Sequence, residues 1–193
     1  MYKISYVFFL VCFSLFSSVG CKPNHQYVYE KFSVSSMDTN GATSSCSISL
    51  SGSEQYVGTD KETGMSLSYF RSPYTVLISF WFPKEQSGVV ELKNVSFFAN
   101  DTLIRCVDVN RKEKFDNKTE FRKGGVPQIR EEKESRASFL VKQVAIPHSK
   151  QKVLITALIS TDKGEVVKTW AFELTPVVEE KLRNDQRDSI MSV

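Results

Sequence analysis

The amino-acid sequence predicts an all-β fold and, within that class, a single antiparallel β-sandwich domain of immunoglobulin-like type. About nine short apolar runs are separated by Gly, Pro, Asn, Asp and Ser, a spacing typical of sandwiches and barrels. Phe, Tyr, Val and Ile are abundant, which favours strands over helices. No strand–helix–strand repeat is recognisable, so a parallel α/β sheet is not expected.

The first half of the predicted domain contains five candidate strands. Residues 27–34, 45–51 and 65–70 have apolar side chains at alternate positions. Residues 74–82 are apolar on both faces, so we expect a central strand that ends at Pro83, whose nitrogen has no hydrogen for the ladder. In residues 89–98 the apolar face shifts across Lys93 and Asn94, which indicates a bulge or a break.

The second half begins with a turn at Asn100 and Asp101, and residues 103–109 and 137–146 are its first candidate strands. The clearest element of the whole sequence follows. Residues 153–160 and 166–174 both alternate with a period of two, and a short turn that ends in Gly164 separates them. Two such runs around a Gly-ended turn predict a β-hairpin.

Two segments do not follow the strand pattern. Residues 110–136 are rich in charges of both signs and contain Gly124 and Gly125, so we expect a long, solvated loop. Residues 177–193 are polar and are expected to form a helix or a frayed end. The predicted sandwich therefore spans residues 27–176, followed by a C-terminal tail.

The start of the chain has the features of a secretory signal. Lys3 precedes an uncharged apolar stretch that continues to Gly20, with small residues at its end. This stretch is short for a membrane-spanning helix, which needs about 20 residues. Residues 1–20 are therefore predicted to be a cleaved signal peptide, and a retained membrane anchor is the alternative.

The sequence Ser18-Val19-Gly20-Cys21 resembles the lipobox of bacterial lipoproteins, although that family prefers an aliphatic residue where Ser18 stands. The resemblance implies a lipid on Cys21, a linker over residues 21–26 and attachment to a membrane. Lys22, which is not Asp, implies sorting to the outer membrane, facing the periplasm. An ordinary signal-peptidase site is the alternative, and it would give a secreted or soluble periplasmic protein.

The number of cysteines favours lipidation. Cys12 leaves with the signal, so Cys21, Cys46 and Cys106 remain, an odd number in an oxidising compartment. A lipid on Cys21 would leave Cys46 and Cys106 as one pair. Because Ile48 and Ile104 have the same strand parity as these cysteines, we expect both thiols to point inward and to form a disulfide. Two buried thiols too far apart to meet are the alternative.

Composition and motifs argue against several functions. A net charge of +3 is too small for binding nucleic acid through its phosphates. His25 and His148 have no metal-ligand spacing and are expected in solvated loops. No GxSxG motif occurs, and we expect no catalytic residue, metal or cofactor. Five aromatic residues are expected to pack in the core: Phe80, Trp81, Phe82, Trp170 and Phe172.

These observations predict that the protein is not an enzyme. The expected function is that of a binding or assembly module, attached to the membrane through Cys21, with a protein partner in the cell envelope. Strand edges and residues 110–136 are expected to make the contacts. A small β-barrel that carries an apolar ligand and an exported hydrolase are the alternatives.

Overall fold

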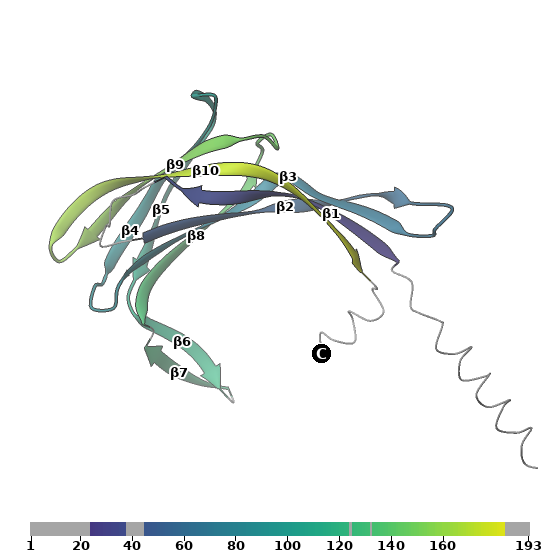
Figure 1. Ribbon diagram of the computed structural model, residues 1–193. Coiled ribbons are helices and arrows are strands. Elements are labelled where there is room, and N and C mark those ends of the chain that lie inside the picture. The colour runs from purple at the N-terminus through teal and green to yellow at the C-terminus, as the bar shows by residue number, and fades with distance from the viewer. Residues whose placement is uncertain (1–23, 38–44, 124, 132, 184–193) are drawn as a thin grey trace, which may run out of the picture. The chain divides into compact units, whose positions relative to one another are not determined.

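The computed structural model describes residues 24–37, 45–123, 125–131 and 133–183. All the regular structure in these ranges is β-strand, so the predicted all-β class is confirmed. Figure 1 labels the strands. They are β1 (His25–Ser36), β2 (Ser45–Thr59), β3 (Ser66–Pro83), β4 (Gly88–Ala99), β5 (Thr102–Phe115), β6 (Lys118–Lys123), β7 (Val126–Glu131), β8 (Glu134–Val144), β9 (Gln151–Thr161) and β10 (Gly164–Arg183).

Eight of these strands form one mixed sheet in the order β2-β3-β1-β10-β9-β4-β5, with β8 paired to β3. The pairs β9–β10, β4–β9, β4–β5 and β3–β8 are antiparallel. Strands β1 and β3 run in the same direction, since Tyr29 stacks on Phe70 and, further along both strands, Phe32 contacts Tyr74. The sheet is therefore not purely antiparallel, in contrast to the expectation from sequence.

The chain divides into two compact units. Of the described residues, 24–28, 56–68 and 180–183 form the first, which we call the terminal unit. The second, which we call the main unit, comprises the described residues from 29 to 55 and from 69 to 179. Strands β1, β2, β3 and β10 contribute residues to both units, and the core described next belongs to the main unit.

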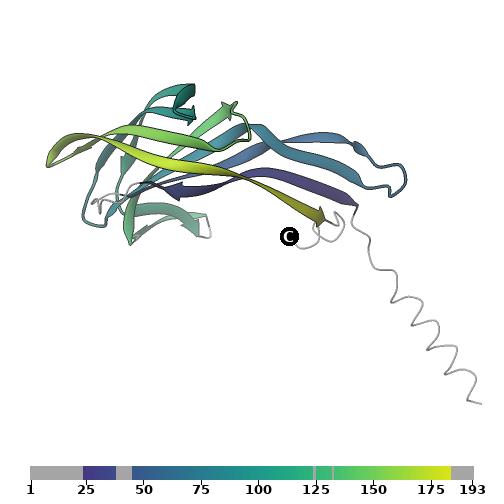
Figure 2. The ribbon, with the colours of Figure 1, turned by 45° about the horizontal axis from the view of Figure 1, so that its top comes forward.

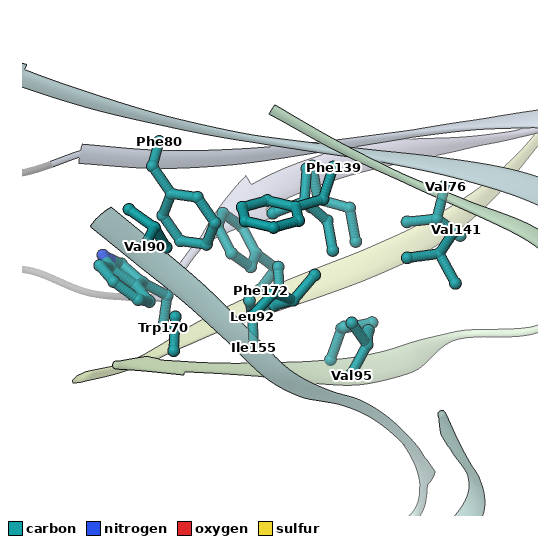
Figure 3. Close-up of a cluster of buried hydrophobic side chains, with 14 of the residues drawn as sticks. Val76, Phe80, Val90, Leu92, Val95, Phe139, Val141, Ile155, Trp170 and Phe172 are labelled. Carbon is teal, nitrogen blue, oxygen red and sulfur yellow. The ribbon is translucent and has the colours of Figure 1, made fainter. Parts of the chain in front are cut away.

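The main unit is held together by a core of inward-facing aromatic and aliphatic side chains, drawn in Figure 3. Phe80 of β3 lies 5.8 Å from the ring of Phe139 on β8 and 5.0 Å from that of Trp170 on β10. Phe82 of β3 stacks on Phe115 of β5, with ring centroids 3.8 Å apart. Because β3 and β5 are far apart in the strand order, the sheet of the main unit curls around this single core.

Alternation of burial explains why these sequences form strands. Along β9 every second residue from Gln151 to Ile159 is buried, and β10 pairs with it from Gly164 opposite Thr161 to Leu174 opposite Gln151. The predicted β-hairpin is therefore confirmed, and Gly164 has the positive φ of 119° that its turn requires. The two strands lie side by side in green and yellow in both ribbon views (Figures 1 and 2).

Two further predictions for the main unit are confirmed, the first of them in part. Strand β3 is central and ends at Pro83, and its inward-facing residues are fully buried, but its other face is not covered, since Leu77 is exposed. A register shift between Leu92 and Asn94 interrupts the pairing of β4 with both β5 and β9, in agreement with the predicted bulge or break across Lys93 and Asn94.

The prediction of a long loop over residues 110–136 is wrong. Strand β5 continues to Phe115, strands β6 and β7 form a separate two-stranded sheet, and β8 begins at Glu134. Buried Phe115 holds the end of β5 against the core. The charged residues of β5, such as Lys112 and Lys114, are exposed, so the strand forms although its sequence is polar.

The prediction of a helical or frayed end from residue 177 is also wrong for residues 177–183. Strand β10 extends to Arg183, and the backbone oxygen of Arg183 accepts a hydrogen bond from the backbone N–H of Asn24 at 3.1 Å. The predicted linker, residues 21–26, likewise overlaps β1, which begins at His25. Residues 184–193 lie outside the described residues.

Candidate binding surface on strand β5

Strand β5 is the last strand in the order of the main sheet. Within the part of the chain that the structure describes, it pairs with β4 along one side and with no strand along the other, although β8 lies close to its second half. Its first five residues are all exposed, and Leu103 has 53% of its surface in contact with solvent. An edge strand that presents apolar side chains is a template for pairing with another chain.

The turn before β5 determines where these side chains lie. Asn100 and Asp101 have φ of 48° and 61°, and Ala99 pairs with Thr102. Positive φ at both central residues is the geometry of the two-residue turn that best matches the twist of a hairpin. The turn therefore brings Leu103 and Ile104 to the start of the edge, where both are exposed.

The second half of β5 is protected against such pairing. Asn110 has a φ of 47° and lies where the register with β4 shifts, which bends the strand. Arg111 then donates a hydrogen bond to the backbone oxygen of Leu140 on β8, at 3.4 Å, and exposed Lys112 and Lys114 follow. Charged side chains and bulges prevent an edge strand from pairing with another chain. We therefore define the β5 edge as residues 102–109.

A half-open hollow of about 230 Å³ adjoins the turn between β4 and β5. Its lining is mixed: apolar Met37 and Phe98 face Asn100, Asp101 and the ion pair between Lys150 and Glu173, whose charged atoms are 3.0 Å apart. This volume is below the usual range of about 300–1,000 Å³ for small-molecule sites. The hollow is therefore a poor site for an apolar ligand.

The carboxylate of Glu91, close to the β5 edge, interacts with two lysine side chains. Glu91 of β4 accepts a hydrogen bond from Lys93 at 2.6 Å, and the ammonium of Lys112 on β5 lies 3.5 Å from its other oxygen. The hydrogen bond from Lys93 is the main reason that the pKa of Glu91 is lowered, and the charge of Lys112 also contributes.

The structure does not contain the predicted disulfide between Cys46 and Cys106; both are thiols. Cys46 is half-buried beside the core, whereas Cys106 is exposed on the outer face of β5 and accepts a hydrogen bond from Ser96 Oγ at 3.4 Å. The parity argument fails on β5 because Val107 and Val109, not Ile104 and Cys106, pack toward the core. Alternate apolar residues occur on both faces of this strand, so the pattern alone was ambiguous.

The prediction that both histidines lie in solvated loops is wrong for His25, which is in a strand, and half right for His148, which lies in the loop between β8 and β9 but is half-buried. His148 is half-buried, its Nε2 lies 2.8 Å from the backbone oxygen of Lys31, and its ring contacts Phe32 edge-on. His25 lies in β1, stacks on Tyr27 and is 2.9 Å from Ser68 Oγ. These contacts give both rings structural roles. Among the described residues no group of three His, Cys, Asp or Glu side chains could hold a metal ion.

The aromatic residues predicted for the core are buried at four of the five positions: Phe80, Phe82, Trp170 and Phe172. Trp81 instead faces outward, with the guanidinium of Arg136 5.5 Å from its ring centroid. Arg136 also donates hydrogen bonds to Ser79 and Ser138, each at 2.9 Å. Trp81 and Arg136 are thus a cross-strand pair on the outer face of β3 and β8.

Residues 1–20 and Cys21, to which the sequence assigns export and lipidation, lie outside the described residues. No helix in the described ranges is long and apolar enough to cross a membrane. No protein-family model, curated protein or solved structure matches this chain.

The sequence predicted binding through strand edges in general and did not single out the β5 edge. The signal for it in the sequence is the adjacent pair Leu103 and Ile104 after a two-residue turn.

Proposed function

We propose that this protein is an exported lipoprotein, attached through a lipid on Cys21 to the outer membrane and facing the periplasm, and that it acts as a non-catalytic binding or assembly module. The observation that supports binding most directly is the β5 edge, where Leu103 and Ile104 are exposed on a strand that pairs along one side only. The signal-like residues 1–20 and the lipobox-like sequence support export and anchoring.

The proposed mode of binding is addition of a strand. An extended segment of a protein partner in the cell envelope aligns with residues 102–109 and forms main-chain hydrogen bonds with them. Leu103 and Ile104 contact apolar side chains of the partner, and burial of each contributes about 1.5–3 kcal/mol. Exposed Arg105 and Asp108 select a partner with complementary charges. Strand addition needs no catalytic group.

The fold proposed for this module is an immunoglobulin-like sandwich. Its support is that the inner faces of β3 and β8 on one side, and of β4, β9 and β10 on the other, share one core. Antiparallel pairing of most neighbouring strands also fits this class. The parallel pair β1–β3 is a departure from a simple sandwich.

Photocrosslinking from the edge tests the binding function. A p-benzoylphenylalanine residue replaces Leu103 in cells, and the matched control replaces Val167, which is 63% exposed but pairs with Leu158 on β9. We expect adducts of one defined additional mass from position 103 and none from position 167. Equal labelling at both positions, or no adduct at position 103, would contradict the proposal.

A charge substitution gives an independent readout. Ile104→Lys places an ammonium where the partner's apolar side chain would lie, and we expect about a tenfold or greater loss of the crosslinked or co-purified partner. Val167→Lys is the control and should retain normal recovery. Partner recovery that is unaffected by Ile104→Lys would show that binding occurs elsewhere.

A further inference from the structure

We infer that the terminal unit lies against the lipid bilayer, with Val57 and Leu182 at the boundary between headgroups and acyl chains. This inference rests on the proposed lipidation of Cys21. It extends that proposal by assigning a second, non-covalent membrane contact to the folded protein.

The first argument is the short reach of the chain. Asn24 is fixed in the terminal unit: its N–H donates to the backbone oxygen of Arg183 at 3.1 Å, and its own oxygen accepts from the N–H of Ser66 at 2.9 Å. Only Lys22 and Pro23 lie between Cys21 and Asn24, and the three steps from Cys21 to Asn24 span at most about 10 Å. A lipid on Cys21 therefore holds this unit directly at the membrane surface.

The second argument is the set of side chains that the unit presents. Val57 near the end of β2 is 56% exposed, and Leu182 near the end of β10 is 60% exposed. Exposed aliphatic side chains with Lys or Arg nearby are typical of surfaces that lie at the membrane interface. Lys61 and Arg183 are the nearby cations, and Arg183 lies 5.4 Å from the ring centroid of Tyr27.

The third argument is the ordered turn between β2 and β3, drawn in blue in Figure 1. One carboxylate oxygen of Asp60 accepts hydrogen bonds from the N–H groups of Glu62 and Thr63 at 2.9 and 2.7 Å, and the N–H of Asp60 donates to the oxygen of Met65 at 2.8 Å. The hydrogen bonds from Thr63 are the main reason that the pKa of Asp60 is lowered. An ordered hairpin presents Val57 to the membrane at little further cost in conformational entropy.

The charges of the terminal unit indicate whether electrostatic attraction or burial of apolar side chains holds it at the membrane. Its described cations Lys61, Lys181 and Arg183 are matched by the acids Asp60, Glu62 and Glu180. A balanced surface gains little from anionic lipid, so burial of apolar side chains supplies the contact. We therefore expect the contact to depend weakly on salt and on the fraction of anionic lipid.

Quenching by brominated lipid tests this inference on the full, mature protein. The protein is extracted from membranes and reconstituted in vesicles of phosphatidylethanolamine and phosphatidylglycerol brominated near the headgroup end of the acyl chains. Val57→Trp adds a reporter, and Val166→Trp is the matched control, since Val166 is also an exposed valine near a hairpin turn, at 51%. Native Trp81 and Trp170 contribute the same background to both variants.

We expect the added emission of Val57→Trp to fall by about half, as for a side chain 5–10 Å into the boundary, with little change for Val166→Trp. Leu182→Trp, at a different strand end, should respond like Val57→Trp. The mass of the N-terminal peptide is measured on the same sample. A lipidated Cys21 with equal quenching at positions 57, 166 and 182 would overturn this inference alone. An unmodified Cys21 would overturn the proposed anchoring and this inference with it.

Discussion

Tyr74 has a buried hydroxyl group whose removal should stabilise the protein. The side chain is fully buried on β3, and its hydroxyl has no hydrogen-bond partner among the described residues. A buried polar group without a partner costs about 1–3 kcal/mol. Tyr74→Phe keeps the ring and its edge-on contact with Phe32. We therefore expect the variant to gain about 1–2 kcal/mol in free energy of unfolding at neutral pH.

The same hydroxyl makes stability depend on alkaline pH. Burial raises the pKa of Tyr74 to about 12 from its ordinary value of 10, and the carboxylate of Glu30 contributes to the increase. The folded chain therefore holds this proton more tightly than the unfolded chain does. This tighter binding of the proton stabilises the folded chain fully below pH 10, and the stabilisation is lost as the pH rises toward 12. At about 1.4 kcal/mol for each unit of pKa difference, the full loss is about 3 kcal/mol.

Urea denaturation followed by tryptophan fluorescence measures both effects. Wild type, Tyr74→Phe and the control Tyr56→Phe, whose hydroxyl is exposed, are compared at neutral pH and at two points above pH 10. Other groups also titrate there, so the difference between variants is the relevant quantity. We expect that difference to increase with pH for Tyr74→Phe only. Destabilisation by more than about 1 kcal/mol at neutral pH would refute the reasoning, since it would mean that the hydroxyl has a partner.

Two further predictions concern the main unit. Phe80→Ala should lower the free energy of unfolding by about 3–5 kcal/mol, because the ring is fully buried against Phe139 and Trp170, whereas Val166→Ala at an exposed site should change it by less than about 0.5 kcal/mol. Glu91→Gln should reduce the loss of stability on acidification, because the pKa of Glu91 is lowered in the folded chain. The contribution of Glu91 to stability is present above the carboxyl pKa of the unfolded chain and is lost as the pH falls through the carboxyl pKa of the folded chain. Denaturation curves across the acidic range measure this, and an unchanged pH profile for Glu91→Gln would contradict the prediction.

The parts of the fold that the sequence predicts are those set by local alternation. Strands β9 and β10 alternate along their whole paired length, and β3 is apolar on both faces up to Pro83. Such patterns depend on one face of a strand being buried. They contain no information about which distant strand lies alongside, so the parallel neighbours β1 and β3 were not predicted.

Exposed strands are the elements that sequence reasoning missed. Residues 110–115 have the charge of a solvated loop, and only the burial of Phe115 distinguishes them as the end of β5. The orientation of Cys106 was missed for a related reason, because Ile104 and Val107 are apolar on opposite faces of the same strand. On an edge strand with two apolar faces, hydrophobic pattern cannot specify which face is inward.

The central claim, that the chain is exported and held at the membrane through Cys21, is tested most directly by the intact mass of the protein extracted from membranes. We expect a polypeptide that begins at Cys21 and has the additional mass of a diacylglyceryl group, with or without a further acyl chain on its amino group. A polypeptide that still begins at Met1, or one that begins at an unmodified Cys21, would contradict the account.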